Sequence, residues 1–391
     1  MDVTRFEASP IGRIVPISGD YGDHHFEHFA YVPRPLPPKI TLADETWGWI
    51  TEAVLALGRL DGAGRRLPNP GVLFRPILRD EAISTSALEG TYTTLPQLLQ
   101  EELFEEEEAP SRDVLEVLNY MRAANRGYAW TKTKPVTLNL VKELHAILLR
   151  DDPECPVTDQ GEIRRRQNYI GPRYAPIEES HFVPPPPGRE LLELLWQWEE
   201  WIHNENIQLF VRMAIGHYQF ETLHPFVDGN GRLGRLIAVL MLLENNALTV
   251  PILSISPYFE DRRDQYQELL REVSESGDFN GWVRFFAGGL RHQAEETLRK
   301  ADRLMVLRDE MVADLRAKKV RGIAIQIAED LIGSPYVTPS IVRNRHGVTY
   351  QAALNGIQRL VTEGVLERVE TSLRSGRRHV YLAPAVLKET S

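Results

Sequence analysis

Twelve consecutive residues, HPFVDGNGRLGR at positions 224–235, carry side chains that could together handle a phosphate group. The stretch holds a histidine beside a proline, an aspartate, an asparagine between two glycines, and two arginines three positions apart. Taken singly, a GxG is often a simple turn, an arginine pair a solvated face and a histidine a structural residue. Their combination in one short segment favours a functional site.

Helical patterns on both sides place this segment at two helix ends. One helix is predicted to end near Leu223, and the next to begin within GNGRLGR. Gly229, Asn230 and Gly231 would then lie at a helix N-terminus, where free N–H groups and the helix dipole favour an anion. Because glycine has no side chain, the backbone could approach phosphate oxygens closely.

The charged residues of the segment would complete a site for nucleotide transfer. Arg232 and Arg235 fall near one face of the first helical turns and could bond to further phosphates. Asp228 precedes the anion cradle and could hold a Mg²⁺ that bridges phosphates. His224 could take a proton from an incoming hydroxyl, since imidazole ordinarily titrates near neutrality.

The rest of the sequence predicts a mainly helical protein. RLIAVLMLLENN (235–246) is apolar on nearly all sides, which is typical of a helix at the centre of a bundle. Asp44 is expected to cap the first helix. The helical patterns cover residues 47–62, 74–90, 112–127, 136–150, 188–205, 207–222, 231–246, 260–275 and 279–317.

Two segments break the helical pattern. Residues 1–43 are rich in turn formers, and the four prolines of YVPRPLPPKI (31–40) predict an extended arm. Residues 160–190 alternate like two short strands joined by a turn. The following PPPP (184–187) marks the exit from that hairpin, with a polyproline binding site as the weaker alternative.

Composition narrows the class of protein. A net charge of −10, with 42% hydrophobic and 26% charged residues, indicates a globular protein that does not coat nucleic acid along its length. The single cysteine, Cys155, excludes an internal disulfide and is expected to be an inert small hydrophobe. No signal-type segment or 18-residue apolar run occurs, so we expect a cytoplasmic protein without a membrane span.

The last part of the chain predicts a winged helix domain. Three helical patterns (IAIQIAEDLIG, TPSIVRNRHG and TYQAALNGIQRLVTEG) precede two alternating segments separated by TSLRSG. Residues 320–391 contain 9 Lys and Arg against 6 Asp and Glu, a local excess of +3. Such domains bind DNA or dock proteins, and the sequence favours neither. The DNA contacts would be Thr349, Tyr350, Gln351, Asn355 and Arg359 from the third helix, with Arg374, Arg377, Arg378 and His379 from the wing.

HPFVDGNGRLGR resembles the signature loop of the Fic (filamentation induced by cAMP) family, HPFx[D/E]GNGRxxR, at every specified position. YVPRPLPP, EAISTSALEGTYTT, GEIRRRQNYIG and the carboxy-terminal segment resemble the common bacterial architecture of that family. The resemblance implies a Fic-type helical bundle with a β-hairpin flap, which would align the target as an added strand at 163–183. The expected domains are an N-terminal region (1–110), a catalytic core (111–318) and a winged helix (319–391).

The resemblance also implies an activity, transfer of AMP from ATP to a Ser, Thr or Tyr hydroxyl of a protein. His224 would deprotonate that hydroxyl, and Asp228 would hold Mg²⁺. Arg232 would contact phosphate, and Arg235 would grip the γ-phosphate. The anion hole for the α- and β-phosphates would be formed by Gly229, Asn230 and Gly231.

An inhibitory element is expected upstream. TSALEG (85–90) resembles the family motif [S/T]xxxE[G/N], with Thr85, Glu89 and Gly90 at the specified positions. An ion pair between Glu89 and Arg235 would remove the γ-phosphate clamp, so ATP could bind only unproductively. Family members sometimes use this glutamate to help remove AMP.

Alternatives stay open at this point. The Fic core could sense a nucleotide for a transcriptional regulator that acts through its winged helix. Some family members transfer other nucleotide or phosphate groups. The protein target is unspecified and could be the chain itself. Members of this layout often self-associate, so a homodimer is a further open possibility.

Overall fold

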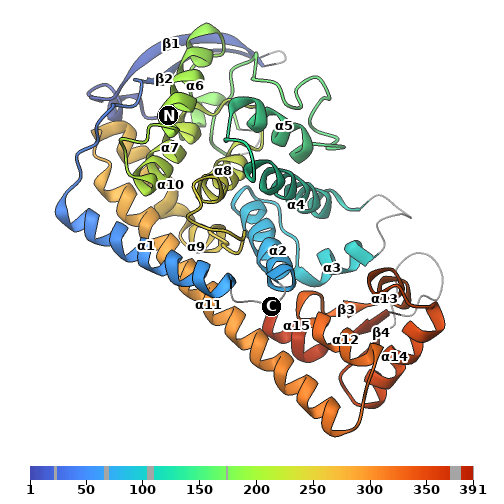
Figure 1. The fold of residues 1–391 in the computed structure, drawn as a ribbon. Helices are drawn as coiled ribbons and strands as arrows, with labels where there is room; N and C mark the ends of the chain where they lie inside the picture. Colours follow the sequence, from blue (N-terminus) through green and yellow to red (C-terminus); the bar gives the residue numbers. More distant parts are fainter. Residues whose placement is uncertain (22–23, 66–69, 104–109, 173–174, 370–379, 391) are drawn as a thin grey trace.

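The computed structural model describes residues 1–21, 24–65, 70–103, 110–172, 175–369 and 380–390 of this chain. It shows a mainly helical protein with small antiparallel sheets, as the sequence predicts (Figure 1). Within these residues, no helix has both the length and the apolar character needed to cross a membrane.

Two buried helices form the centre of the molecule. All residues from Phe210 to the end of α7 (Leu209–Leu223) are buried, as are those of α8 (Asn230–Glu244) as far as Leu242. The predicted burial of the apolar stretch after Arg235 is therefore confirmed. Figure 1 shows the surrounding helices, which are α4 (Arg112–Thr131), α5 (Leu138–Leu148), α6 (Arg189–Ile202), α9 (Ser256–Glu260) and α10 (Arg263–Ser276).

Two long helices run side by side along one flank. α1 (Asp44–Gly64) lies against α11 (Asn280–Ala317), which at 1.5 Å per residue is roughly 57 Å long and reaches from the core to the C-terminal region (Figure 1). The expected cap at Asp44 is wrong by one residue. Ala43 holds the cap position, and its N–H donates to Asn280 Oδ1 at 2.9 Å.

The N-terminal segment contains a hairpin instead of only an extended arm. β1 (Gly12–Tyr21) pairs antiparallel with β2 (His24–Pro33), with Gly12 opposite Pro33. Phe26, Ala30 and Val32 lie at alternate positions of β2 and are buried, and Tyr31 between them is buried as well. The apolar residues at these positions were a strand signal, although the turn formers and prolines around them suggested an irregular arm.

The two strands predicted within 160–190 are also wrong. Among the described residues of this segment, only Ile170 and Phe182 form an antiparallel bridge. Between them lies one 3₁₀ turn, η2 (Ile177–Glu179), and the other described residues before α6 form loops. Polar groups here find separate partners: Gln167 donates to Pro184 O and Asn168 to Phe226 O, both at 2.9 Å. The segment is held by these individual bonds and not by a strand ladder.

The C-terminal region follows the predicted order of elements. α12 (Ile323–Asp330) and η3 (Leu331–Gly333) precede α13 (Pro339–His346) and α14 (Tyr350–Thr362). A small sheet has the order β3-β5-β4, and the chain continues into α15 (Pro384–Thr390). The strands are β3 (Tyr336–Val337), β4 (Glu367–Val369) and β5 (Val380–Leu382). The expected wing contacts, Arg374, Arg377, Arg378 and His379, lie outside the described residues.

A hydrophobic cluster extends through most of the chain. Its buried members run from Val32 to Val386, so they include side chains from all three expected domains. The domain boundaries near residues 110 and 318 stay a prediction.

The helix that carries the expected inhibitory motif is anchored in this core. α2 (Pro70–Leu88) precedes α3 (Leu95–Leu103), and both contact α4. Glu81 of α2 is 1% exposed, and its carboxylate binds the N-terminus of α9. Its donors are Tyr120 OH, Ser254 Oγ, Ile255 N–H and both the N–H and Oγ of Ser256. Because a buried carboxylate requires such donors, Glu81 fixes α2 against the core.

Candidate active site

The loop between α7 and α8 has a constrained backbone. α7 ends at Leu223, and His224 adopts a left-handed conformation with φ 45°. Gly229 has φ 75°, which glycine adopts without strain, and α8 begins at Asn230. The Asn230 amide binds both the N–H and the C=O of Phe226 at 2.9 Å. Its side chain therefore fixes the loop by bonding to the loop backbone, a role that the sequence does not indicate.

His224 is held as a neutral imidazole. Burial, assisted by the nearby charge of Arg164, lowers its pKa to about 4. Its Nδ1 lies 3.3 Å from Glu221 O. Because a carbonyl oxygen can only accept, Nδ1 carries the proton and Nε2 keeps a lone pair. At neutral pH this side chain is able to receive a proton.

Arg164 stabilises the backbone conformation of His224. It is 3% exposed, and its Nε donates to His224 O at 2.9 Å while its own backbone N–H donates to Pro225 O at 3.0 Å. A non-glycine residue at positive φ typically costs on the order of 1–3 kcal/mol, which surrounding bonds must offset. The sequence shows three consecutive arginines at 164–166 but does not indicate which one reaches the loop.

His145 of α5 holds the other side of the loop. Its Nδ1 accepts from Gly161 N–H at 2.8 Å, so the proton is on Nε2, which donates to Asp228 O at 3.1 Å. The ring stacks on Phe226 with centroids 3.9 Å apart. Burial lowers the pKa of His145 to about 4. No local pattern distinguishes this histidine in the sequence.

Asp228 and Arg232 face one another across the start of α8. The Asp228 side chain is 52% exposed, and its Oδ1 accepts from Gly229 N–H at 2.5 Å and from Arg232 Nη2 at 3.4 Å. Burial opposes ionisation, but Arg232 and this N–H outweigh it and lower the pKa of Asp228. Arg232 is 1% exposed and also binds Glu116 of α4 at 3.0 Å. Glu116 is a further site residue that sequence reasoning missed.

Glu89 lies over the N-terminus of α8, next to Gly231 and Arg235. Its Oε1 is 2.6 Å from Arg235 Nη2, and Arg235 also donates to Thr85 Oγ1 at 2.7 Å and to Thr85 O at 3.0 Å. A side chain at Gly231 would place its Cβ 2.1 Å from Glu89 Oε1, so only glycine leaves room for the carboxylate there. The structure thus brings together all the residues that the sequence predicted for the site. Burial opposes the charge of Arg235, but Glu89 outweighs it and raises the pKa of Arg235.

Fold and site together define a helical protein with a glycine-containing loop that leads into the N-terminus of a buried helix, and a glutamate that lies over that N-terminus. Residues 48–129 match the Fic/DOC family N-terminal model, and residues 135–242 match the Fic/DOC family model. The chain therefore contains a Fic/DOC family N-terminal region and a Fic/DOC region, as the signature loop indicates.

Curated relatives match part of the chain, and solved structures share its fold. A protein adenylyltransferase Fic from Drosophila mojavensis is 35% identical over 156 residues, which cover 39% of this chain and 27% of the relative. This chain thus spans about a quarter of the length of the curated relatives that it matches. A crystal structure of a Fic family protein from Desulfovibrio desulfuricans G20 shares the fold at 20% identity, with a TM-score of 0.56 over 89% of this chain and 98% of that chain. A Fic domain containing signaling protein from Bacteroides thetaiotaomicron is 19% identical, with a TM-score of 0.51 over 65% and 95% of the two chains.

The buried His145 predicts a dependence of stability on pH. Its folded pKa of about 4 lies below the ordinary value of about 6.5 expected in the unfolded chain. Between these values the unfolded chain binds a proton that the folded chain does not, so the free energy of unfolding falls as pH drops from about 6.5 to about 4. We expect His145→Gln to reduce this slope in urea denaturation series, since glutamine can bridge the same partners without titrating. His145→Asn is the matched control, too short for both bonds, and should reduce the slope but also lower stability. An unchanged slope in both variants would show that His145 is not the group whose lowered pKa causes this pH dependence.

Proposed function

We propose that this protein transfers AMP from ATP to a Ser, Thr or Tyr hydroxyl of a protein and that Glu89 restrains this activity. The observation that carries the proposal is the meeting of neutral His224, ionised Asp228 and the N-terminus of α8 in one loop. The name of the Drosophila relative, a protein adenylyltransferase, supports the same reaction.

The chain's own groups suit each part of that transfer. Nε2 of His224 takes the proton of the target hydroxyl, and the hydroxyl oxygen attacks the α-phosphorus of ATP. The bond from that phosphorus to the oxygen bridging to the β-phosphate breaks, and pyrophosphate leaves. Backbone N–H groups at 229–231 and the dipole of α8 stabilise the phosphate charge.

Asp228 fits a magnesium ion that arrives with ATP. Mg²⁺ prefers oxygen ligands and is often held by one or two carboxylates together with substrate phosphates and water. The half-exposed, ionised carboxylate of Asp228 is such a ligand. The described residues contain no group of three or more His, Cys, Asp or Glu side chains that could hold a metal ion by themselves. A bound Mg²⁺ would neutralise phosphate charge next to the cradle.

The position of Glu89 supports the proposed restraint. Arg235 is 1% exposed and makes its shortest contact with the Glu89 carboxylate, so it is not available to a γ-phosphate. The carboxylate also lies over Gly231, where phosphate oxygens would bind. Two anions cannot share this cradle, and therefore productive ATP binding requires Glu89 to leave.

Removal of the Glu89 carboxylate should raise activity. We expect Glu89→Gly to increase modification of the chain itself and of protein targets, measured with labelled ATP and mass spectrometry of the modified chains. Glu89→Gln keeps the volume but removes the charge and should give an intermediate rate. Adding Arg235→Ala should reverse the gain, because the γ-phosphate then has no clamp. A Glu89→Gly protein no more active than wild type under saturating Mg-ATP would refute the restraint.

The histidine should be required for transfer but not for nucleotide binding. In the Glu89→Gly background we expect His224→Ala to lower transfer by on the order of 10²–10⁴-fold, the usual contribution of a general base. Calorimetry should show ATP affinity largely unchanged, because the cradle and not the imidazole holds the phosphates. Near-normal transfer would exclude His224 as the base.

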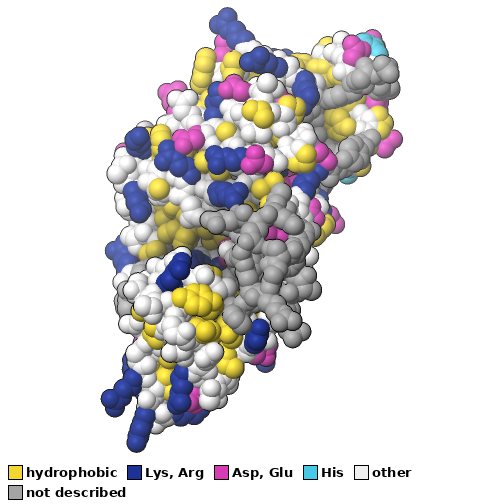
Figure 2. Space-filling model, turned by 90° about the vertical axis from the view of Figure 1, so that its right-hand side faces the viewer, with side chains coloured by type: hydrophobic (Ala, Val, Ile, Leu, Met, Phe, Trp, Pro, Cys, Tyr) yellow, Lys and Arg dark blue, Asp and Glu magenta, His cyan; other side chains and the backbone are white. Residues whose placement is uncertain are grey.

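A second candidate function concerns the C-terminal region, for which we propose binding of duplex DNA. The five residues expected to contact DNA from the third helix are all exposed, and α14 contains no acidic residue. The C-terminal region lies at the bottom of Figure 2, which shows Lys and Arg side chains around it. A helix without acidic residues suits a polyanion, and the acidic group beside it, Glu363 directly after α14, is ion-paired with Arg359 at 2.7 Å. If it binds DNA, nucleotide sensing by the Fic core could serve transcriptional control.

This second function predicts salt-sensitive DNA binding. The full chain should shift duplex fragments taken from upstream of its own coding sequence, with affinity that falls as salt rises, because phosphate neutralisation releases counterions. Gln351→Glu with Asn355→Glu should weaken the shift, while Glu52→Gln on the distant helix α1 should not. The absence of any shift at low salt would leave protein docking or dimerisation as the role of this region.

A further inference from the structure

Glu89 lies at the tip of a helical hairpin whose base is docked on the C-terminal region. α2 and α3 form the two arms, and Glu89 precedes the short link between them. α2 contacts η3, and α3 contacts β3. In the latter contact, Leu99 packs in one buried cluster with Tyr336 and Val380. Both arms that hold the glutamate therefore rest on the same distant region of the chain.

One buried side chain ties these parts together. Arg79 of α2 is 4% exposed, and its Nη1 donates to Gly333 O of η3 at 3.0 Å. Its Nε and Nη2 grip the Glu102 carboxylate of α3, with a shortest distance of 2.6 Å. Arg79 thus closes the base of the α2–α3 hairpin and joins it to the C-terminal region through charge-assisted bonds.

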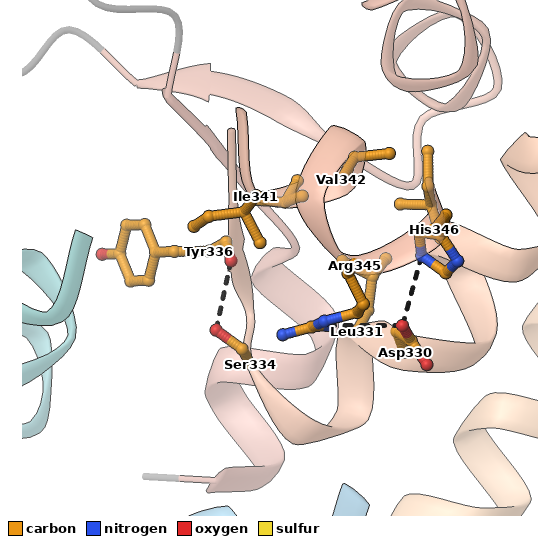
Figure 3. A pocket seen from close by; sticks show the side chains of 10 residues that line it. Asp330, Leu331, Ser334, Tyr336, Ile341, Val342, Arg345 and His346 are labelled. Carbon is orange, nitrogen blue, oxygen red and sulfur yellow. Dashed lines mark hydrogen bonds and ion pairs between the residues drawn. The ribbon is translucent and has the colours of Figure 1, made fainter. Parts of the chain in front are cut away.

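The contact point on the C-terminal region is itself connected to α13. Figure 3 shows Asp330, at the end of α12, facing Arg345 and His346 of α13, next to Leu331. Asp330 Oδ2 is 3.3 Å from Arg345 Nη1 and 3.3 Å from His346 Nε2. Because η3 follows Asp330 directly, its Gly333 carbonyl is placed by the same packing that places α13.

The inhibitory contact depends on accurate placement. Glu89 must lie 2.6 Å from Arg235 and directly over Gly231, within a space that no side chain at 231 could share. Arg79 lies ten residues before Glu89, which directly follows the end of α2. At the helical rise of 1.5 Å per residue, the two are about 15 Å apart along the helix axis. A tilt of about 4° over that length moves the helix end by about 1 Å, enough to lengthen a 2.6 Å ion pair markedly.

We propose that Arg79 is a positioning residue of the inhibitory contact, through which the C-terminal region keeps Glu89 on Arg235. The proposal rests on the proposed function and adds the origin of its regulation. Any partner that displaces η3 or α13 would loosen the hairpin base and release the cradle for ATP. The C-terminal region is then a regulatory input to the site and not only an appended module.

A double-mutant comparison on the full chain tests this proposal. Arg79→Gln and Glu102→Gln remove the same ion pair from its two ends, and the Glu102 side chain is 22% exposed, so its variant should fold. Each should raise AMP transfer by about tenfold, the effect of losing one set of charge-assisted bonds. In the Glu89→Gly background neither should change transfer, because no inhibitory carboxylate is left to position. The matched control is Arg126→Gln, which breaks an Arg–Glu pair between α4 and α5. It should have no effect in either background.

Hydrogen exchange separates this proposal from the proposed function. Amide exchange over residues 85–95 should accelerate in Arg79→Gln and in Glu102→Gln but not in Arg126→Gln. If Glu89→Gly transfers no AMP, the proposed function fails, and exchange alone decides on the role of Arg79. Unchanged exchange, unchanged transfer in the wild-type background while Glu89→Gly is active, or an equal rise in both backgrounds would overturn the positioning role.

Discussion

The ion pair between Glu89 and Arg235 is the interaction on which the rest of the site depends. Arg235 is almost fully buried, and a buried guanidinium needs a counter-charge and hydrogen-bond acceptors, which Glu89 and Thr85 supply. Both acceptors come from α2 and its end, far earlier in the chain. The glycine at 231 leaves the space that the carboxylate fills. One contact therefore satisfies a buried charge and, under the proposed function, occupies the place of a phosphate.

Burial also determines the protonation state of two histidines at the loop between α7 and α8. The desolvation that makes a lone charge costly also keeps His224 and His145 neutral, each with a pKa of about 4. For His145 this fixes a hydrogen-bond donor on the loop backbone, and for His224 it leaves a lone pair on Nε2. Arg164 and Asn230 complete the support by binding loop backbone groups. A strained loop is thus held in one conformation, in which the proposed function has the imidazole of His224 receive the proton of a hydroxyl.

The helix α2 links this chemistry to the remainder of the chain. Glu81 binds it to α9, Thr85 and the residue after its end reach Arg235, and Arg79 connects its base with α3 and η3. The proposed inhibition and the proposed regulation therefore use one element, with separate side chains for anchoring, blocking and coupling. A C-terminal region packed on the same hydrophobic cluster as the core can influence the site without touching it.

The sequence by itself determined most of the long helices, the order of the three helices in the C-terminal region and the residue types of the loop at 224–235, because these depend on short-range periodicity and on neighbouring residues. It did not predict the short helices α3, α9 and α15. It also indicated that Glu89 could meet Arg235. It did not reveal the hairpin at 12–33, and it predicted strands at 163–183 where the backbone bonds individually. Arg164, His145, Glu116 and Arg79 could not be identified either. Their roles arise from contacts between segments distant in the chain, and only the tertiary packing decides which buried polar groups find one another.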